Sequence, residues 1–153
     1  MVRRTVLVIA GLLLAACGED VSKPYLEFAG GGFVFNYRNA EAFYGFVARP
    51  VRPMPDKAII EVQFEMPGGA PPGIQREPAR SGQMKYSFKS AQLSGVVKNH
   101  DYKVVVRVLD GPTGKELARY DHAFRSDVDQ ASLPSKPLVV GPGYEPNPDL
   151  APN

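Results

Sequence analysis

The feature that most constrains this chain is the alternation of apolar and polar residues in several short segments. In residues 57–66, KAIIEVQFEM, every second residue from Ala58 to Met66 is apolar. Residues 83–89 and 102–109 repeat the pattern. Successive side chains of a strand point to opposite faces, so a period of two predicts strands that are buried on one face only.

Seven short strands are predicted in this way. Four more segments rich in aromatic and β-branched residues read as strands: 24–29, 32–38, 42–49 and 115–125. Turn formers separate them, among them Gly30–Gly32 and the DGPTG of 110–114, which predicts a hairpin. Beyond the N-terminal run, no segment of helical length shows a convincing helical stripe. The pattern predicts an all-β fold, a two-layer antiparallel β-sandwich of about seven strands.

Tyr102 opens one of these strands directly after the polar loop 97–101. The corner tyrosine of immunoglobulin-like sandwiches opens strand F in the same way, and its hydroxyl bonds back to the preceding loop. Residues 84–125 therefore resemble the E-F-G portion of an immunoglobulin or fibronectin type III-like domain. A single cysteine and no tryptophan exclude antibody-type domains. The resemblance implies a fold and no particular activity.

The N-terminus reads MVRRTVLVIAGLLLAAC, with Arg3 and Arg4 before the uncharged run 6–16. A basic start, a short apolar middle and small closing residues are the anatomy of a secretory signal. A transmembrane helix needs about 20 apolar residues, and this run is shorter. We therefore predict a signal helix within residues 1–16.

The quartet Leu14-Ala15-Ala16-Cys17 resembles the lipobox of bacterial lipoproteins at every position. The resemblance implies cleavage before Cys17 and a covalent diacylglyceryl and acyl lipid on this only cysteine. Two or more acyl chains anchor a protein stably in a membrane, whereas one chain binds marginally. Gly18 stands where an aspartate would retain a lipoprotein in the inner membrane, so the resemblance favours the outer membrane.

Processing divides the chain into a signal peptide, 1–16, and a mature protein with three parts. These are a lipidated tether at 17–23, a β-sandwich domain at 24–126 and an acidic, proline-rich tail at 127–153, which we expect to be disordered. Cleavage removes two of the 18 basic residues and none of the 16 acidic ones, so the mature formal charge is zero. The mature chain therefore lacks the strong positive field typical of nucleic-acid-binding proteins.

The two histidines do not predict a metal site. In the expected hairpin His122 lies opposite about Lys103 and His100 opposite about Arg125, which separates the imidazoles by roughly 10 Å of strand rise. One metal ion cannot join ligands that far apart. His122 is expected to pack at the edge of the core.

No constellation of residues predicts catalysis. Glu61 and Glu65 lie two pleats apart on the polar face of one strand, about 13 Å by strand rise. That separation is too long for paired acid-base work, so we expect both carboxylates to be solvated. No serine stands in a G-x-S-x-G motif. We predict a protein that is not an enzyme and that binds no metal or other cofactor.

Aromatic residues and arginines gather in residues 33–52, and such residues dominate protein interfaces. The phenylalanines are expected in the core. The predicted partner surface comprises Tyr37, Arg38, Tyr44, Arg49 and Arg52. The sequence thus predicts a lipid-anchored envelope protein that binds another envelope protein or scaffolds an assembly, with the membrane reached through its lipid.

Three other functions stay open at this point. A small-molecule or glycan binder would carry a groove lined by tyrosines, expected near the long loop 67–82. An envelope hydrolase would use a cleft with His100 and Asp101. In a purely structural role, the tail 127–153 would space or decorate the envelope and the sandwich would only mount it.

Overall fold

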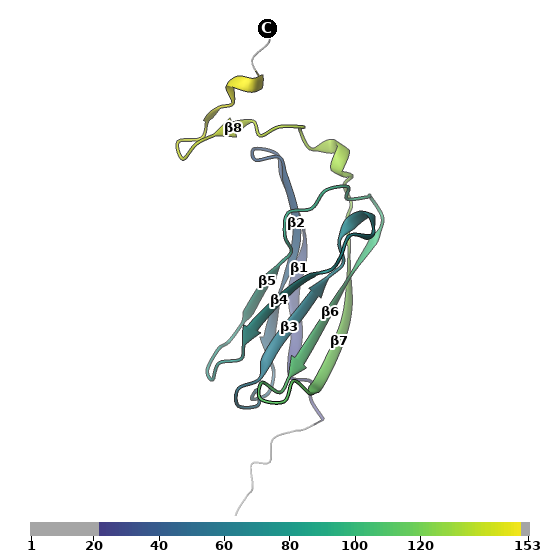
Figure 1. Ribbon diagram of the computed structural model, residues 1–153, viewed down its shortest axis with the longest axis vertical. Coiled ribbons are helices and arrows are strands. Elements are labelled where there is room, and N and C mark those ends of the chain that lie inside the picture. The colour runs from purple at the N-terminus through teal and green to yellow at the C-terminus, as the bar shows by residue number, and fades with distance from the viewer. Residues whose placement is uncertain (1–21, 151–153) are drawn as a thin grey trace, which may run out of the picture.

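A computed structural model describes residues 22–150 of the chain (Figure 1). The predicted signal helix, the lipobox residues 14–17 and most of the tether lie outside the described residues. Within the described part, no helix is long and apolar enough to cross a membrane. Strands and a few 3₁₀ turns make up its secondary structure.

Seven strands form two antiparallel sheets that pack as a sandwich (Figure 1). One sheet has the order β1-β2-β5 and the other the order β4-β3-β6-β7. The strands are β1 (Leu26–Asn36), β2 (Glu41–Pro50), β3 (Ile59–Phe64), β4 (Gly73–Pro78), β5 (Tyr86–Lys89), β6 (Asp101–Leu109) and β7 (Glu116–Arg125). The prediction of an all-β, antiparallel, sandwich-like fold is confirmed.

The core lies between the two sheets and is filled by alternate residues of the central strands. Each fully buried large apolar side chain contributes about 1.5–3 kcal/mol to folding. The inward residues of β2, β3 and β6 are Ala42, Tyr44, Phe46, Ala48, Ile60, Val62, Phe64, Tyr102, Val104, Val106 and Val108. The alternation read from residues 57–66 and 102–109 therefore predicted the buried faces of β3 and β6 correctly.

The glycine run Gly30–Gly32 is not a turn, as the sequence had suggested, but lies inside the long strand β1. A bulge after Phe28 shifts the register with β2 there. A Cβ atom on Gly31 would lie 2.5 Å from the carbonyl oxygen of Gly45 and 2.6 Å from Cβ of Phe46. Glycine is needed at this position because the backbone of β1 approaches its neighbours closely. Close backbone approach is one of the common reasons for a glycine inside a strand.

The proline-rich excursion 67–82 was predicted to have no secondary structure, but it contains β4. This strand pairs with β3 from Phe64 opposite Gly73 to Ile59 opposite Pro78. It is an edge strand, where proline and polar residues are tolerated on the unpaired side, so its sequence does not alternate. Seven strands were predicted and seven form the sandwich, but the two sets differ. The predicted strands 24–29 and 32–38 are both parts of β1, and β4 was not predicted.

The hairpin β6–β7 turns at DGPTG as predicted, but its register differs by one residue. His122 lies opposite Val104 instead of Lys103. The shift arises at a bulge between Val108 and Leu109, which adds one residue to the pairing. No feature of the alternating pattern indicated this bulge.

The structure describes residues 127–150 of the tail, for which the sequence predicted disorder. The tail contains the 3₁₀ turns η2 (Gln130–Ser132) and η3 (Pro148–Leu150) and the short paired strands β8 (Val139–Val140) and β9 (Glu145–Pro146). Between its prolines, the N–H groups of Leu138 and Val139 bond to the carbonyl oxygen of Arg38 in the β1–β2 turn. Residues 151–153 lie outside the described part.

The sandwich has two distinct ends (Figure 1). At the entry end β1 begins and β2 finishes, and the loops 50–57 and 79–83 are located there. At the far end lie the β1–β2 turn at 37–40 and the loop 96–100, and the tail arches over this end (Figure 1). The chain thus enters the domain at one end and folds its tail over the other.

We expect Gly31→Ala to lower the free energy of unfolding by about 1–3 kcal/mol, because the added methyl group overpacks the contact between β1 and β2. Gly73→Ala is the matched control, since a Cβ there meets only Met66 Sδ at 3.6 Å and Phe64 Cβ at 3.9 Å. Urea denaturation of both variants measures the difference. Equal stability of the two variants would contradict this account of the glycine run.

Candidate functional site

The five residues predicted to form one partner surface lie in three separate places. Tyr37 and Arg38 are exposed in the β1–β2 turn at the far end. Arg49 and Arg52 lie at the entry end, beyond a strand of ten residues that spans roughly 30 Å. Tyr44 is in the core, with no exposed surface. These five residues do not form one surface.

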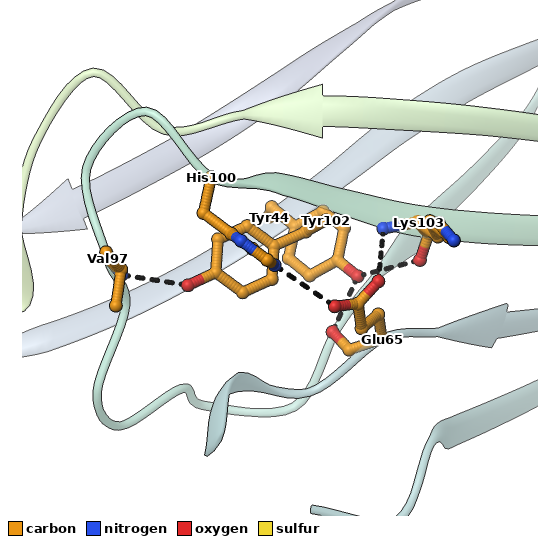
Figure 2. A network of polar contacts seen from close by, with 6 residues as sticks. All are labelled: Tyr44, Glu65, Val97, His100, Tyr102 and Lys103. Carbon is orange, nitrogen blue, oxygen red and sulfur yellow. Dashed lines mark hydrogen bonds and ion pairs between the residues drawn. The ribbon is translucent and has the colours of Figure 1, made fainter. Parts of the chain in front are cut away.

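The assignment of Tyr44 to the surface is wrong. Its hydroxyl crosses from β2 to the facing sheet, where it donates to the carbonyl oxygen of Glu65 at 2.8 Å and lies 3.3 Å from that of Lys103 (Figure 2). Burial, followed by the nearby charge of Glu65, raises the pKa of Tyr44 well above its ordinary value. A tyrosine is tolerated in this core because its polar tip finds partners at the far side.

Tyr102 makes the corner contact predicted from the sequence. Its hydroxyl accepts a hydrogen bond of 2.8 Å from the main-chain N–H of Val97, in the loop that precedes β6 (Figure 2). The ring is 2% exposed, and the ring of His100 lies against its edge at 4.5 Å between centroids. The tyrosine thus fixes the loop 96–100 to the core.

Glu65 and His100 form a polar pair over this corner, which the sequence did not predict. His100 Nε2 lies 3.2 Å from Glu65 Oε1, and Glu65 Oε2 accepts a bond of 2.9 Å from the N–H of Lys103 (Figure 2). Partial burial alone would raise the pKa of Glu65, but the Lys103 N–H and His100 outweigh it and lower the pKa below its ordinary value. If the pairing of β3 with β6 had been predicted, it would have placed Glu65, just after β3, near the start of β6 and His100.

Within residues 22–150, the side chains of His100 and Glu65 hydrogen-bond to each other and to no third side chain. The only polar side-chain partner of His100 there is Glu65, and no hydroxyl group bonds to its imidazole. His122 belongs to β7, where it stacks on Phe28 at 4.4 Å. In the described part of the chain, no group of three His, Cys, Asp or Glu residues is placed to hold a metal ion. The polar pair holds the loop in position.

Glu61 was expected to be solvated, but it is 2% exposed. Its register partners on the two neighbouring strands are Arg76 and Arg107, and both guanidinium groups pair with its carboxylate. The Arg76 Nε bond to Glu61 measures 2.7 Å. Two long basic side chains cover the carboxylate from either side. The triad is a structural feature of the outer sheet face, where desolvation offsets much of the Coulomb gain.

The tail is bonded to the loop 96–100 and to the β1–β2 turn. Gln130 N–H donates to the carbonyl oxygen of Val96 at 2.8 Å, and just before the tail Ser126 accepts a bond of 2.7 Å at its carbonyl oxygen from Asn99 N–H. Further along, Leu138 N–H donates to the carbonyl oxygen of Arg38 at 2.7 Å. Main-chain bonds therefore join three segments far apart in sequence into one far end.

Exposed apolar side chains are concentrated on these far-end segments. Tyr37 on the turn is 47% exposed, and Tyr144 between β8 and β9 is 61% exposed. Leu138 and Val140 beside them are also exposed. We call Tyr37, Leu138, Val140 and Tyr144 the far-end apolar set. Large apolar groups that stay in water on neighbouring segments are typical of interaction sites.

The entry end carries a cavity of about 450 Å³ between the loops 50–57 and 79–83. Its lining includes Arg52, Lys57 and Arg80 together with prolines, and contains no tyrosine. The glycan-binding alternative predicts a groove lined by exposed tyrosines near loop 67–82. This cavity is lined instead by basic residues and prolines.

Comparison of the chain with protein-family models, with curated proteins and with solved structures finds no match. What the protein does is therefore inferred from its own residues and geometry.

The contribution of Glu65 to stability depends on pH. Its pKa is lower in the folded chain, so the ionised carboxylate stabilises the fold above the unfolded-state pKa of about 4.3, and this contribution disappears as the pH falls through the folded-state pKa. Glu65→Gln removes the contribution. We expect the difference in unfolding free energy between wild type and variant to shrink between about pH 5 and pH 3. Urea denaturation across that range measures it, and a difference independent of pH would contradict the assignment.

Proposed function

We propose that the protein is a lipid-anchored lipoprotein of the bacterial cell envelope, held by acylated Cys17 in the outer membrane. Its sandwich acts without catalysis as a module that binds another envelope protein or scaffolds an assembly. The observation that carries this proposal is that the chain enters the sandwich at one end and exposes apolar side chains at the opposite end. β1 begins at the entry end, only nine residues after Cys17, whereas the far-end apolar set lies at the other end.

The tether length limits how far the entry end can lie from the membrane. Nine residues reach at most about 30 Å when fully extended. The entry end is therefore kept close to the lipid headgroups, and the length of β2 alone separates it from the far end by roughly another 30 Å. The far end is then the part of the sandwich that can extend furthest from the membrane toward a partner.

The sandwich is, in this proposal, of the immunoglobulin or fibronectin type III-like kind. A sheet of three strands faces one of four, and the corner hydroxyl of Tyr102 bonds back to the loop before its strand. Both features belong to that architecture. The same architecture serves many unrelated functions, so the choice of a binding role depends on the surface and not on the fold.

The composition of the far end favours a protein partner. Tyrosine is enriched at interface hot spots because its ring buries a large area while its hydroxyl keeps a hydrogen bond. Arg38 follows Tyr37 directly in the exposed turn, and arginine is also favoured at interface hot spots. The bonds that fix the turn and the tail to each other reduce the ordering cost of binding.

In-cell crosslinking followed by pull-down tests the proposal. We expect the wild-type chain to recover a defined envelope protein, and the variant Tyr37→Ser/Tyr144→Ser to recover roughly tenfold less or lower still, since losing one hot-spot aromatic costs about 2 kcal/mol. Cys17→Ala should also lose the partner, because the chain is no longer concentrated at the membrane.

Met84→Ser/Leu117→Ser is the matched control, since both side chains are exposed and apolar, with Met84 just before β5 and Leu117 at the start of β7, toward the entry end. It should recover the partner as the wild type does. Equal recovery by the far-end variant and this control would contradict the assignment of the binding surface. Unchanged recovery by Cys17→Ala would contradict the role of the anchor.

A further inference from the structure

The cavity at the entry end has a rigid frame. Ala58 N–H donates to the carbonyl oxygen of Pro55 at 3.1 Å, and Ala79 N–H donates to that of Ala58 at 2.8 Å, which fixes the two loops to each other. Arg80 N–H donates to the hydroxyl of Tyr86 at 3.0 Å. Prolines at 50, 53 and 55 restrict the backbone of the longer loop further. A cavity of about 450 Å³ falls in the range of ligand-binding pockets.

The lining is electropositive and its charges are not neutralised. Arg52, Lys57 and Arg80 face one acid, Asp56, among the lining residues. In the part of the chain that the structure describes, none of these three basic side chains takes part in an ion pair. Other arginines of the fold, such as Arg76, are paired with carboxylates. The cavity thus concentrates unpaired positive charge.

Arg52 is held in place while part of its hydrogen-bonding capacity stays unused. Its guanidinium carbon lies 3.6 Å from the centroid of the Tyr25 ring, a stacked cation–π contact. Its Nε is buried and has no hydrogen-bond partner among the described residues. Lys57, on the same lining, has a φ of 58°, in the left-handed region that favours glycine or asparagine. Unsatisfied donors and unusual backbone conformations are frequent at ligand sites.

We propose that this cavity binds a phosphate-bearing anion through Arg52, Lys57 and Arg80. Guanidinium groups match the geometry of phosphate oxygens, and a lysine adds a point charge. Donors from two loops converge on one space, which suits a tetrahedral group with several acceptor oxygens. The volume leaves room for an organic substituent beside the phosphate.

The location of the cavity defines two sources for this anion. Arg52 stacks on the ring of Tyr25, which lies just before β1 where the chain enters the domain. On a membrane-anchored chain, the headgroup of an anionic phospholipid is within reach of the entry end. A soluble phosphate ester offers the same chemistry. The proposal concerns the cavity alone and does not depend on acylation of Cys17.

Hydrogen exchange of the full chain in vesicles tests the proposal and separates the two sources. Three conditions are compared: phosphatidylcholine vesicles, the same vesicles with added glycerol 1-phosphate, and vesicles that contain phosphatidylglycerol. We expect slower exchange of the amides in 51–57 and 79–83 in at least one of the last two. A ligand at about ten times its Kd slows exchange by roughly tenfold where amides exchange from the free state.

Protection by glycerol 1-phosphate identifies a soluble phosphate ester as a ligand, and protection only in phosphatidylglycerol vesicles identifies a lipid headgroup. The variant Lys57→Gln/Arg80→Gln should lose this protection; both side chains are exposed, so the fold is kept. Arg38→Gln/Lys98→Gln removes the same charge at the far end and should keep it. Absence of protection in both conditions, or equal loss in the two variants, would overturn the proposal.

Discussion

The far end of the fold depends on a buried tyrosine that joins the two sheets by a hydrogen bond. Tyr44 is inside the sandwich, and its hydroxyl reaches main-chain carbonyl oxygens of the facing sheet. Its ring packs among those of Phe33, Phe64 and Tyr102, with centroids 4.9, 5.2 and 6.1 Å away. An unpaired hydroxyl in such a core would cost free energy, so this bond favours the observed relative position of the sheets.

The far end is built outward from that contact. The segment that accepts the Tyr44 hydroxyl bond also carries Glu65, which pairs with His100 in the loop before β6. The corner bond of Tyr102 fixes the same loop, and the tail bonds to it in turn. The positions of the turn, the loop and the tail at this end are therefore fixed by contacts with the core. The entry end is fixed separately, by bonds between its two loops.

The sequence predicted those parts of the fold in which local pattern and tertiary contact agree. Alternation from Ala58 to Phe64 marked the inward face of β3, and Tyr102 marked the corner. Tyr44 misled because its residue type suits either a surface or a core that offers an acceptor. Glu61 misled because only the register of both neighbouring strands reveals the two arginines that cover it. Such features depend on pairings distant in sequence, which no single segment encodes.

The candidate sites were harder to predict for the same reason. Proximity along the chain placed Arg38 and Arg52 together in one predicted surface, but a strand that runs the length of the sandwich separates them. The tail and the turn 37–40 are about 100 residues apart in sequence and are joined by main-chain bonds. Main-chain groups carry no residue-specific signal, so this contact could not be read from composition.

The central proposal is that the sandwich is anchored with its entry end close to the membrane surface and its far end directed away from it. Paramagnetic relaxation in nanodiscs with spin-labelled lipid headgroups tests it most directly on the full chain. The account predicts strong broadening of amide signals in loops 51–57 and 79–83 and none in the turn 37–40 or around Tyr144. Broadening at the far end, or equal broadening at both ends, would contradict it.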